Sequence, residues 1–540
     1  MMPSARPILA LCSALCVCLL CACAVAPRPT KASAVAKPGK APAAAKPAEN
    51  VGYASFRKAR EILDLSLVAY GIPAEDQGTA EATLTYSGTM HYQGHYNAPS
   101  ASREYRVDGT CVFSRRFDAM AHTGRLTGEG EDDPWTTVVM RDRHFHVDSG
   151  ELEKPGTKPP AYHRRRIAAL LPPRLLELAA ARAASLRWLG EDTLDGAPHD
   201  VIAFADDDGV LVTLYLGRKT RWLSRVETLR ADPQEGDLVE WVRYGDHRPL
   251  PGASVVLPRT IEWQEGHSRW SVRIADGDFH LGVRSEAATF AVPEPHRPGV
   301  TDWIVQERRT EPLVVTPLGR DLYMIEVPDQ NDKVLFAVMD DYVIAMEAPV
   351  DSETGERILA TIRRQVPDRP VRYVIMSHHH EHYIGGARAF VSAGVTLVTT
   401  PGNEALLRER AARPHRVSPD RLAREPREPK LLLVKEKHVF EDAHHRIEVH
   451  DLGPGSKHTD EYLITYVPSE RLLFQGDLAN FADSGPPPKP RPRARGLLDG
   501  IRRLKLDVDR IVQSWPLRGQ KKVATMEDLV RLTSEPPPPP

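Results

Sequence analysis

Hydrophobic and polar positions alternate through most of the first half of the chain, between residue 51 and about residue 300. An amphipathic helix near 54–70 comes first, and short runs rich in β-branched and aromatic residues follow it, separated by Asp, Gly and Pro turns. A hydrophobic period of two predicts strands with one buried face. The pattern therefore predicts one curved antiparallel sheet with few helices. Its clearest strands are 79–86, 210–216, 222–230 and 270–274, and a further helix is expected near 173–189.

The second half of the chain, from about residue 313, has a different pattern. Three consecutive apolar runs predict strands, and an amphipathic helix is expected over 352–366. The next run, 371–376, is apolar at almost every position, which is typical of a strand buried on both faces. Strands that alternate with helices indicate an α/β arrangement. The three early strands are expected at 321–327, 333–339 and 342–346.

Length and composition fit a soluble protein of two domains. A chain of 540 residues exceeds what one hydrophobic core usually supports. Hydrophobic residues make up 41% and charged residues 27% of the chain, and the formal net charge is −2. Because no basic excess is present to neutralise phosphates, nucleic acid is excluded as a partner. We expect a β-rich domain at 51–300, a second domain at 313–534 and a Pro tail at 535–540.

The first fifty residues have the character of a secretion signal and a tether. Five of the six cysteines lie within the first 23 residues, which excludes a disulfide framework in the mature chain. The apolar run at 8–20 is short for a membrane span and is typical of a signal peptide. Residues 24–50 are rich in Ala, Pro and Lys and cannot bury enough apolar surface to fold, so a tether is expected there.

The tetrapeptide Leu20-Cys21-Ala22-Cys23 resembles the lipobox of bacterial lipoproteins. The resemblance implies that residues 1–23 hold the signal peptide and that Cys23 is the lipid-anchor cysteine. Ala24 after this cysteine implies the outer membrane, with the protein facing the periplasm. We therefore expect a lipid-anchored protein of the bacterial cell envelope that contacts the membrane through its anchor. An ordinary cleaved signal peptide and an uncleaved anchor stay open as alternatives.

A cluster of histidines follows the buried strand at 371–376. Four of the five residues 378–382 are histidines, and Glu381 is the fifth. Imidazoles at positions i and i+2 of an extended segment point to the same side, so His378 and His380 can reach one zinc ion. The glycine pair at 385–386 would let the chain turn tightly and bring the next helix close to the sheet.

A second candidate cluster lies downstream of the first. The loop at 452–460 offers a third imidazole, His458, and the strand expected at 471–476 is followed directly by Asp477. An α/β fold gathers its functional site from loops at the ends of its strands. We therefore expect His458 and Asp477 to join the first histidine cluster.

Together these motifs resemble the metallo-β-lactamase fold hydrolases over about 313–533. The family pattern has His-x-His-x-Asp-His before two glycines, then Gly-x-x-His-Thr, and later a strand that ends Leu-Phe-x-Gly-Asp. The resemblance implies an αββα sandwich that follows the half-barrel-like β-rich domain. It also implies a first zinc site made by His378, His380 and His458, with Asp477 as the carboxylate that bridges two metals.

The second metal site of that family is incomplete in this sequence. Aligned without gaps, His382 replaces an aspartate, Tyr383 replaces a histidine, and Trp515 stands near the usual late histidine. With a slip of one residue, Glu381 replaces the aspartate and His382 is the histidine, but Trp515 still cannot bind a metal. We expect one zinc ion, and a second, altered site that uses His382 and Asp477 stays open.

The resemblance implies a zinc-dependent hydrolase of a small-molecule substrate, acting on an ester, thioester, lactone, lactam or phosphoester bond. A zinc ion with three imidazole ligands polarises a carbonyl or phosphoryl oxygen and supplies hydroxide as the nucleophile. Asp477 would orient the water or accept its proton, and Glu381 is a second candidate base.

An alternative hypothesis gives the chain a binding role. The β-rich half resembles, in its pattern alone, the half-barrel of bacterial lipoprotein carriers, and the missing second-site groups are compatible with lost catalysis. The alternative is a catalytically degenerate metallo-β-lactamase-fold lipoprotein that binds an apolar ligand or a partner. The sequence specifies neither the substrate nor the oligomeric state.

Overall fold

The computed structural model describes most of the chain from Asn50 onward, and residues 50–540 belong to one compact unit. The predicted signal peptide with Cys23, the tether up to Glu49 and the Pro tail at 535–540 lie outside the described residues. The described ranges are 50–71, 81–128, 131–140, 143–148, 151–152, 158–251, 255–266, 268–275, 278–291, 311–485 and 491–534.

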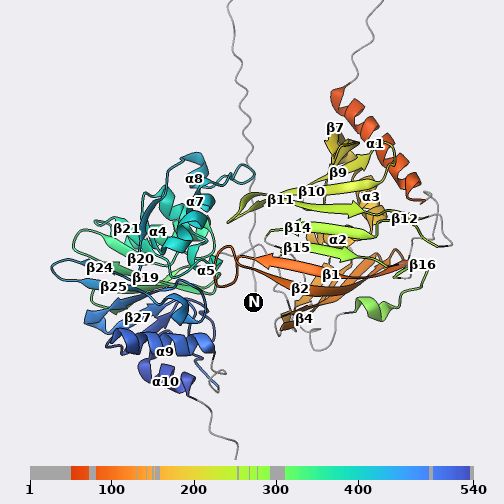
Figure 1. Cartoon of the computed structure of the whole chain (residues 1–540). Coiled ribbons are helices and arrows are strands. Elements are labelled where there is room, and N and C mark those ends of the chain that lie inside the picture. Colours follow the sequence, from red (N-terminus) through yellow and green to blue (C-terminus); the bar gives the residue numbers. More distant parts are fainter. Residues whose placement is uncertain are drawn as a thin grey trace, which may run out of the picture. The chain divides into compact units, whose positions relative to one another are not determined.

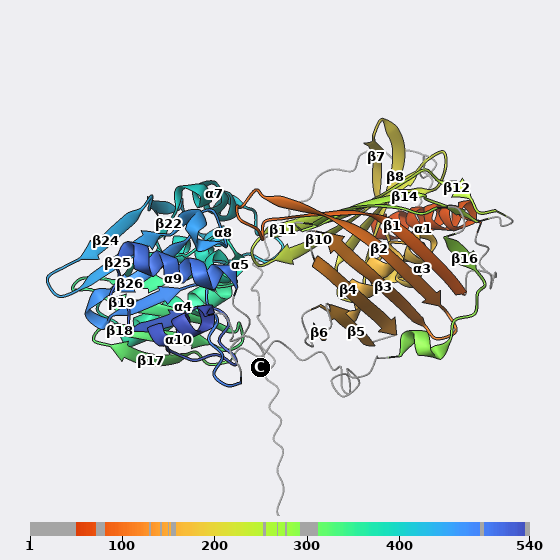
Figure 2. The same ribbon diagram turned by 60° about the horizontal axis from the view of Figure 1, so that its bottom comes forward.

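The first half of the chain forms an antiparallel sheet, which confirms the fold class expected for it (Figures 1 and 2). Within the described residues the strand order is β6-β5-β4-β3-β2-β1-β15-β14-β11-β10-β9-β8-β7, and β16 also pairs with β1. The strands are β1 Glu81–Gln93, β2 Ser102–Ser114, β3 Ala119–Gly128, β4 Glu131–Met140, β5 Arg143–Asp148, β6 Glu151–Leu152, β7 Arg187–Leu194, β8 Ala197–Ala205, β9 Leu211–Gly217, β10 Leu223–Asp232, β11 Gly236–Gly245, β14 Thr260–Glu265, β15 Ser268–Arg273 and β16 Phe279–Leu281, with β12 Arg248–Pro249 and β13 Val256–Leu257 as a separate ribbon.

Three helices share the hydrophobic core of this sheet: α1 Val51–Ala69, α2 Pro160–Ala168 and α3 Pro172–Ala181. The helix expected near 173–189 is shorter than its apolar pattern predicts, because the chain pairs with β8 from Arg187 onward. Strand pairing therefore overrides the helix propensity of these last residues. None of the described helices is long and apolar enough to cross a membrane.

The second half of the chain is built on two sheets, which confirms the predicted αββα class (Figure 1). In the first sheet β17–β20 are antiparallel and β20–β23 are parallel. The second sheet is antiparallel except for the parallel pair β27–β28. The strands are β17 Val314–Gly319, β18 Leu322–Val327, β19 Asp332–Val338, β20 Val343–Met346, β21 Val371–Ile375, β22 Thr396–Thr399 and β23 Lys430–Leu433, then β24 Lys437–Glu441, β25 Arg446–Asp451, β26 Leu463–Val467, β27 Leu472–Gln475, β28 Arg510–Gln513 and β29 Ala524–Thr525.

Three apolar layers hold the sandwich together. One layer lies between the two sheets, a second packs α4, α6, α7 and α8 on the first sheet, and a third packs α9 and α10 on the second. The amphipathic helix expected at 352–366 is α4, and its Ile358, Leu359 and Ile362 are buried in the second layer. The helices are α4 Ser352–Gln365, α5 Glu381–Ile384, α6 Ala387–Ser392, α7 Glu404–Ala412, α8 Arg421–Arg424, α9 Pro492–Leu504 and α10 Met526–Thr533.

Candidate metal centre

The first histidine cluster lies between the end of β21 and the short helix α5. His378 and His380 are 0% and 3% exposed, so their imidazoles belong to the interior of the protein. Gly385 holds this turn in place, because a Cβ atom there would lie 2.1 Å from the carbonyl oxygen of Val350. The glycine predicted to allow a tight approach is thus required by close backbone packing.

The second cluster lies in the loop after β25 and at the end of β27. A 3-10 turn at Gly453–Ser456 leads to Lys457, which has a left-handed φ of 55°, and the chain then presents His458. The backbone N–H of Leu463 donates to the carbonyl of Ser377 at 2.8 Å. This bond joins the start of β26, which follows the loop with the third histidine, to the end of β21, so the two clusters meet.

The structure brings His378, His380 and His458 together, with one ligand atom of each within 4.8 Å of the others. His378 Nε2 lies 3.0 Å from His380 Nδ1. Two nitrogens that share one tetrahedral zinc ion are about 3.3 Å apart. His458 Nε2 is buried and makes no well-formed hydrogen bond within the described residues, and the Asp477 carboxylate lies 3.3 Å from it. Three imidazoles that converge beside a carboxylate form a donor set that fits a metal ion.

His378 and His380 each use one ring nitrogen in a contact outside the cluster. The other nitrogen of each ring, Nε2 of His378 and Nδ1 of His380, faces the cluster and is available to a metal ion. His378 Nδ1 lies 3.0 Å from Ser377 Oγ, and His380 Nε2 donates to the Tyr96 carbonyl at 3.2 Å. Burial lowers the pKa of His378 well below its ordinary value and lowers that of His380 to about 3. Both rings are therefore neutral at neutral pH, which is the form that binds a metal.

Asp477 lies beside the three histidines and is paired with a cation. Its Oδ2 is 3.3 Å from His458 Nε2 and 2.5 Å from an Nη atom of Arg493, and its Oδ1 accepts from the Tyr462 hydroxyl at 3.3 Å. Burial raises the pKa of the Asp477 carboxyl, but the contacts with His458 and the charge of Arg493 outweigh it and keep the pKa well below its ordinary value. The carboxylate is therefore ionised and fixed in orientation.

Glu381, the second candidate base, is engaged by a residue from the other half of the chain. Its carboxylate lies 3.3 Å from His95 Nδ1, in the connection between β1 and β2. Burial raises the pKa of Glu381, but the bond and charge of His95 outweigh it and lower the pKa to about 2. A carboxylate with so low a pKa is a weak proton acceptor at neutral pH.

Apart from Asp477, the residues expected at a second metal site make contacts with other side chains. His382 Nδ1 is 3.0 Å from Asp332 Oδ2, and its ring packs near Trp515 at 5.2 Å between centroids. Tyr383 is 2% exposed, and its ring lies 4.1 Å from that of His378. Among the described residues, the group of converging ligand atoms at this site contains the three histidines and not His382. A role for His382 in metal binding stays a prediction.

Sequence reasoning did not find three contributors to this site, Arg493, His95 and the Tyr96 carbonyl. Arg493 lies in the first turn of α9, in a segment without a recognisable motif, and its contact with Asp477 exists only in the fold. The contact from Tyr96 joins residues 284 positions apart and uses a backbone oxygen, which leaves no trace in side-chain patterns.

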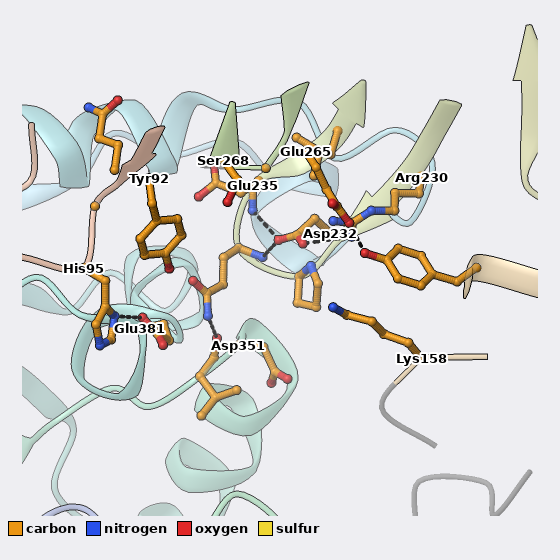
Figure 3. A pocket seen from close by; sticks show the side chains of 18 of the residues that line it. Tyr92, His95, Lys158, Arg230, Asp232, Glu235, Glu265, Ser268, Asp351 and Glu381 are labelled. Carbon is orange, nitrogen blue, oxygen red and sulfur yellow. Dashed lines mark hydrogen bonds and ion pairs between the residues drawn. The ribbon is translucent and has the colours of Figure 1, made fainter. Parts of the chain in front are cut away.

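A cavity of about 680 Å³ adjoins the cluster and is lined by residues of both halves of the chain (Figure 3). His95 and Glu381 lie together at one side of it, and Arg230 and Asp232 lie at another. His379, a residue that is 3% exposed, also lines the cavity. The three clustered histidines are not among its lining residues, so the His95–Glu381 pair stands at the border between cavity and cluster.

Comparison with known proteins finds a family match for the region that carries the histidine cluster. Residues 351–515 match the family model described as the Metallo-beta-lactamase superfamily. Solved structures with a similar fold include DIM-1 metallo-beta-lactamase, at 15% identity over 42% of this chain and 97% of that chain, with a TM-score of 0.32. The metallo-beta-lactamase FIM-1 from Pseudomonas aeruginosa in its mono-zinc form is 16% identical over 42% of this chain and 96% of that chain, with a TM-score of 0.31. A metallo-beta-lactamase from Pontibacter korlensis is 17% identical over 41% of this chain and 97% of that chain, with a TM-score of 0.31.

The comparison with curated proteins gives no match. The family match covers both histidine-bearing loops, together with Asp477 and Arg493. Residues 351–515 therefore match the superfamily that the histidine motifs resemble, and this match supports a metal-dependent hydrolase or a related function.

Proposed function

We propose that the protein is a zinc-dependent hydrolase of an ester, thioester, lactone, lactam or phosphoester bond in a small molecule. The observation that carries the proposal is the convergence of His378, His380 and His458 on one point beside the ionised Asp477. A zinc ion held there would polarise a substrate oxygen and lower the pKa of water to near 7.

The chain's own residues then have defined tasks. His378 Nε2, His380 Nδ1 and His458 Nε2 would hold the ion. Asp477, fixed by Arg493 and Tyr462, would accept a hydrogen bond from the attacking water and so orient it. Glu381 is paired with His95, which favours Asp477 over Glu381 as the group that directs the water.

One zinc ion per chain is the stoichiometry that we propose. Asp477 is the residue that bridges two metals in the family pattern, but here the Arg493 guanidinium contacts its Oδ2. A fixed cation at this carboxylate repels a second metal ion and takes its place as counter-charge. His382, the other candidate ligand of a second ion, is bound to Asp332.

The test combines elemental analysis with a panel of hydrolase substrates. The purified protein should contain about one zinc ion per chain, and His458→Ala should lose both the metal and hydrolysis. His438→Ala is the matched control, because His438 packs against Phe440 on β24, away from the cluster. Absence of stoichiometric metal, or full hydrolysis by His458→Ala, would refute the proposal.

A non-catalytic role is the second candidate, and it is favoured by the cover over the cluster. His95 stacks on His380 with ring centroids 4.1 Å apart, and the Tyr96 carbonyl bonds its Nε2, so part of the site is closed. A protein that binds zinc but hydrolyses no substrate of any of the five bond classes would support a binding lipoprotein instead.

We also propose that Cys23 is lipidated and anchors the protein in the bacterial outer membrane, facing the periplasm. The support is the lipobox-like Leu20-Cys21-Ala22-Cys23 and the Ala/Pro/Lys segment that follows it. Labelled fatty acid should be incorporated by the wild type and by Cys21→Ala, but not by Cys23→Ala. Equal labelling of all three proteins would exclude Cys23 as the anchor.

A further inference from the structure

The connection between β1 and β2, residues 94–101, reaches from the antiparallel sheet to the histidine cluster. Gln93 and Ser102 are the last paired residues of the two strands, so the segment forms the tip of a hairpin. Through this tip the first half of the chain contacts both loops that carry the histidines. We call residues 94–101 the hairpin tip.

The first contact fixes the orientation and the protonation of His380. The Tyr96 carbonyl can only accept a hydrogen bond, so His380 Nε2 must carry the proton in the 3.2 Å contact between them. His380 Nδ1 is then the nitrogen with a free lone pair, and it faces His378 Nε2 at 3.0 Å. Partners of this kind set the tautomer and direction of metal-binding histidines.

The second contact places an aromatic ring against the same histidine. The His95 ring stacks on that of His380, with 4.1 Å between centroids and 10° between planes. The other side of His95 is held by the carboxylate of Glu381, the residue that follows His380. His380 is therefore held by the hairpin tip at its edge and at its face.

The third contact ties the tip to the loop of the third histidine. The Asn97 carbonyl accepts from the backbone N–H of Asp460 at 2.8 Å, and the Asn97 side chain donates to the Asp460 carboxylate at 2.9 Å. Asp460 lies two residues after His458. One short segment thus connects the loop of His378 and His380 with the loop of His458.

We propose that the hairpin tip of the N-terminal sheet is a working part of the metal centre, which positions His380 and His458 and thereby sets metal affinity. The inference rests on the proposed function, because it needs the three histidines to bind zinc. His95, Tyr96 and Asn97 are positioning residues in this proposal. The N-terminal half is then required for the chemistry of the C-terminal half.

The two halves of the chain have contacts with each other that do not involve the hairpin tip, so these contacts would remain if the tip were removed. A second hairpin, between β10 and β11, makes its own contacts, in which the Asp237 carboxylate accepts from the backbone N–H groups of Arg416 and Val417 at 2.7 and 2.8 Å. Glu235 of this hairpin also pairs with Arg413. Loss of the tip should therefore change the metal centre and leave the rest of the molecule assembled.

The test measures zinc affinity by competition with a chromophoric chelator, in the full chain. One variant replaces the tip by Asn-Gly, which can join Gln93 to Ser102 as a two-residue turn. Two others are His95→Ala and Asn97→Ala. His91→Ala is the matched control, because this residue lies on β1 and pairs with the exposed Glu104. Each tip variant should bind zinc about 10- to 100-fold more weakly, and His91→Ala should bind it normally.

A second readout separates positioning from general damage. The unfolding midpoint of the zinc-free variants should equal that of the zinc-free wild type, and the visible spectrum of the cobalt-loaded tip variants should change. Wild-type zinc affinity in all tip variants overturns the inference, and so does weakened affinity that merely follows a lowered midpoint. A wild type that binds no zinc would instead overturn the proposed function.

Discussion

At the scale of single residues, the contact between Arg493 and Asp477 is the feature that the family pattern of histidines does not predict. Asp477 is 6% exposed, so the charge of its carboxylate needs a partner within the protein. Arg493 supplies that partner, with an Nη atom 2.5 Å from Asp477 Oδ2. Under the proposed function, the Arg493 guanidinium takes the place of a second metal ion as the counter-charge of Asp477.

We expect Arg493→Ala to reduce hydrolysis about 100-fold, because a fixed charge beside the reacting groups is lost and Asp477 is released. Zinc content should stay at one ion per chain, since the three histidines are untouched. Arg493→Lys keeps the charge and should retain more activity. Steady-state kinetics on the best substrate of the panel, with zinc analysis of each variant, gives the answer. Wild-type rates in Arg493→Ala would show that the guanidinium has no part in the reaction.

A second residue-scale prediction concerns Asp420, which holds the buried Arg388 through bonds of 2.7 and 2.9 Å. Burial raises the pKa of Asp420, but Arg388 and the backbone of Ala423 outweigh it and lower the pKa from 3.8 to about 2. Because the folded value is the lower one, the pair stabilises the protein above about pH 4, and this stability is lost as the pH falls through 2.

Asp420→Asn should therefore cost about 3 kcal/mol of unfolding free energy at pH 7, because it leaves a buried guanidinium without its counter-charge. Urea unfolding of both proteins at a series of pH values measures this difference. The difference should shrink between about pH 4 and pH 2, as the wild-type carboxylate becomes protonated. A difference that does not vary over this range would contradict the assigned direction of the pKa shift.

The sequence could predict those site residues that carry a motif. His378 and His380 are two positions apart after a buried strand, and His458 and Asp477 follow recognisable spacings. All four lie within one cluster in the structure. Arg493 could not be predicted in the same way, because many arginines occur in the chain and only the fold selects the one that meets Asp477.

At the scale of elements, the helix α9 connects this arginine to the loop of the third histidine. Arg493 lies in its first turn, and Gly496 lies one turn further on. A Cβ atom at Gly496 would be 2.5 Å from the carbonyl oxygens of Gly455 and Ser456, in the turn that precedes His458. The helix and the loop are thus in backbone contact, and the position of one sets that of the other.

Gly496→Ala should separate α9 from this loop, lower stability by about 1 to 3 kcal/mol and weaken zinc binding. The control is Gly455→Ala on the other side of the same contact, because a Cβ atom there would meet nothing within 4 Å. Chemical unfolding and zinc competition on both variants measure the effect. Equal behaviour of the two variants would mean that the close approach of α9 has no role in placing His458.

Most elements could be predicted from their hydrophobic period, whereas their connections could not. The strands β9, β10, β18, β19 and β27 lie within a few residues of the expected runs. The predicted end of the helix near 173–189 was wrong, because residues 187–189 alone do not indicate that they pair with β8. The hairpin tip was also missed, because no local pattern indicates which distant loop it touches.

At the scale of the whole molecule, zinc binding should appear as added stability. A ligand that binds only the folded state stabilises it by about 4 kcal/mol at a free concentration 1,000 times its Kd. The three nitrogens come from loops that are 80 residues apart in the chain, so the unfolded chain presents no comparable site. For a domain of about 200 residues this corresponds to a rise in Tm of roughly 8 to 16 °C.

Calorimetry with and without excess zinc should therefore show this rise for the wild type and for His438→Ala, and none for His458→Ala. Because the hairpin tip joins the sheet to both histidine loops, the rise should also be reduced in the variant that replaces residues 94–101 by Asn-Gly. If that variant showed the full wild-type rise, the metal would stabilise the C-terminal sandwich independently of the N-terminal sheet. A reduced rise would instead mean that the hairpin tip strengthens zinc binding in the folded protein, through the contacts of Tyr96 and Asn97 with the two loops.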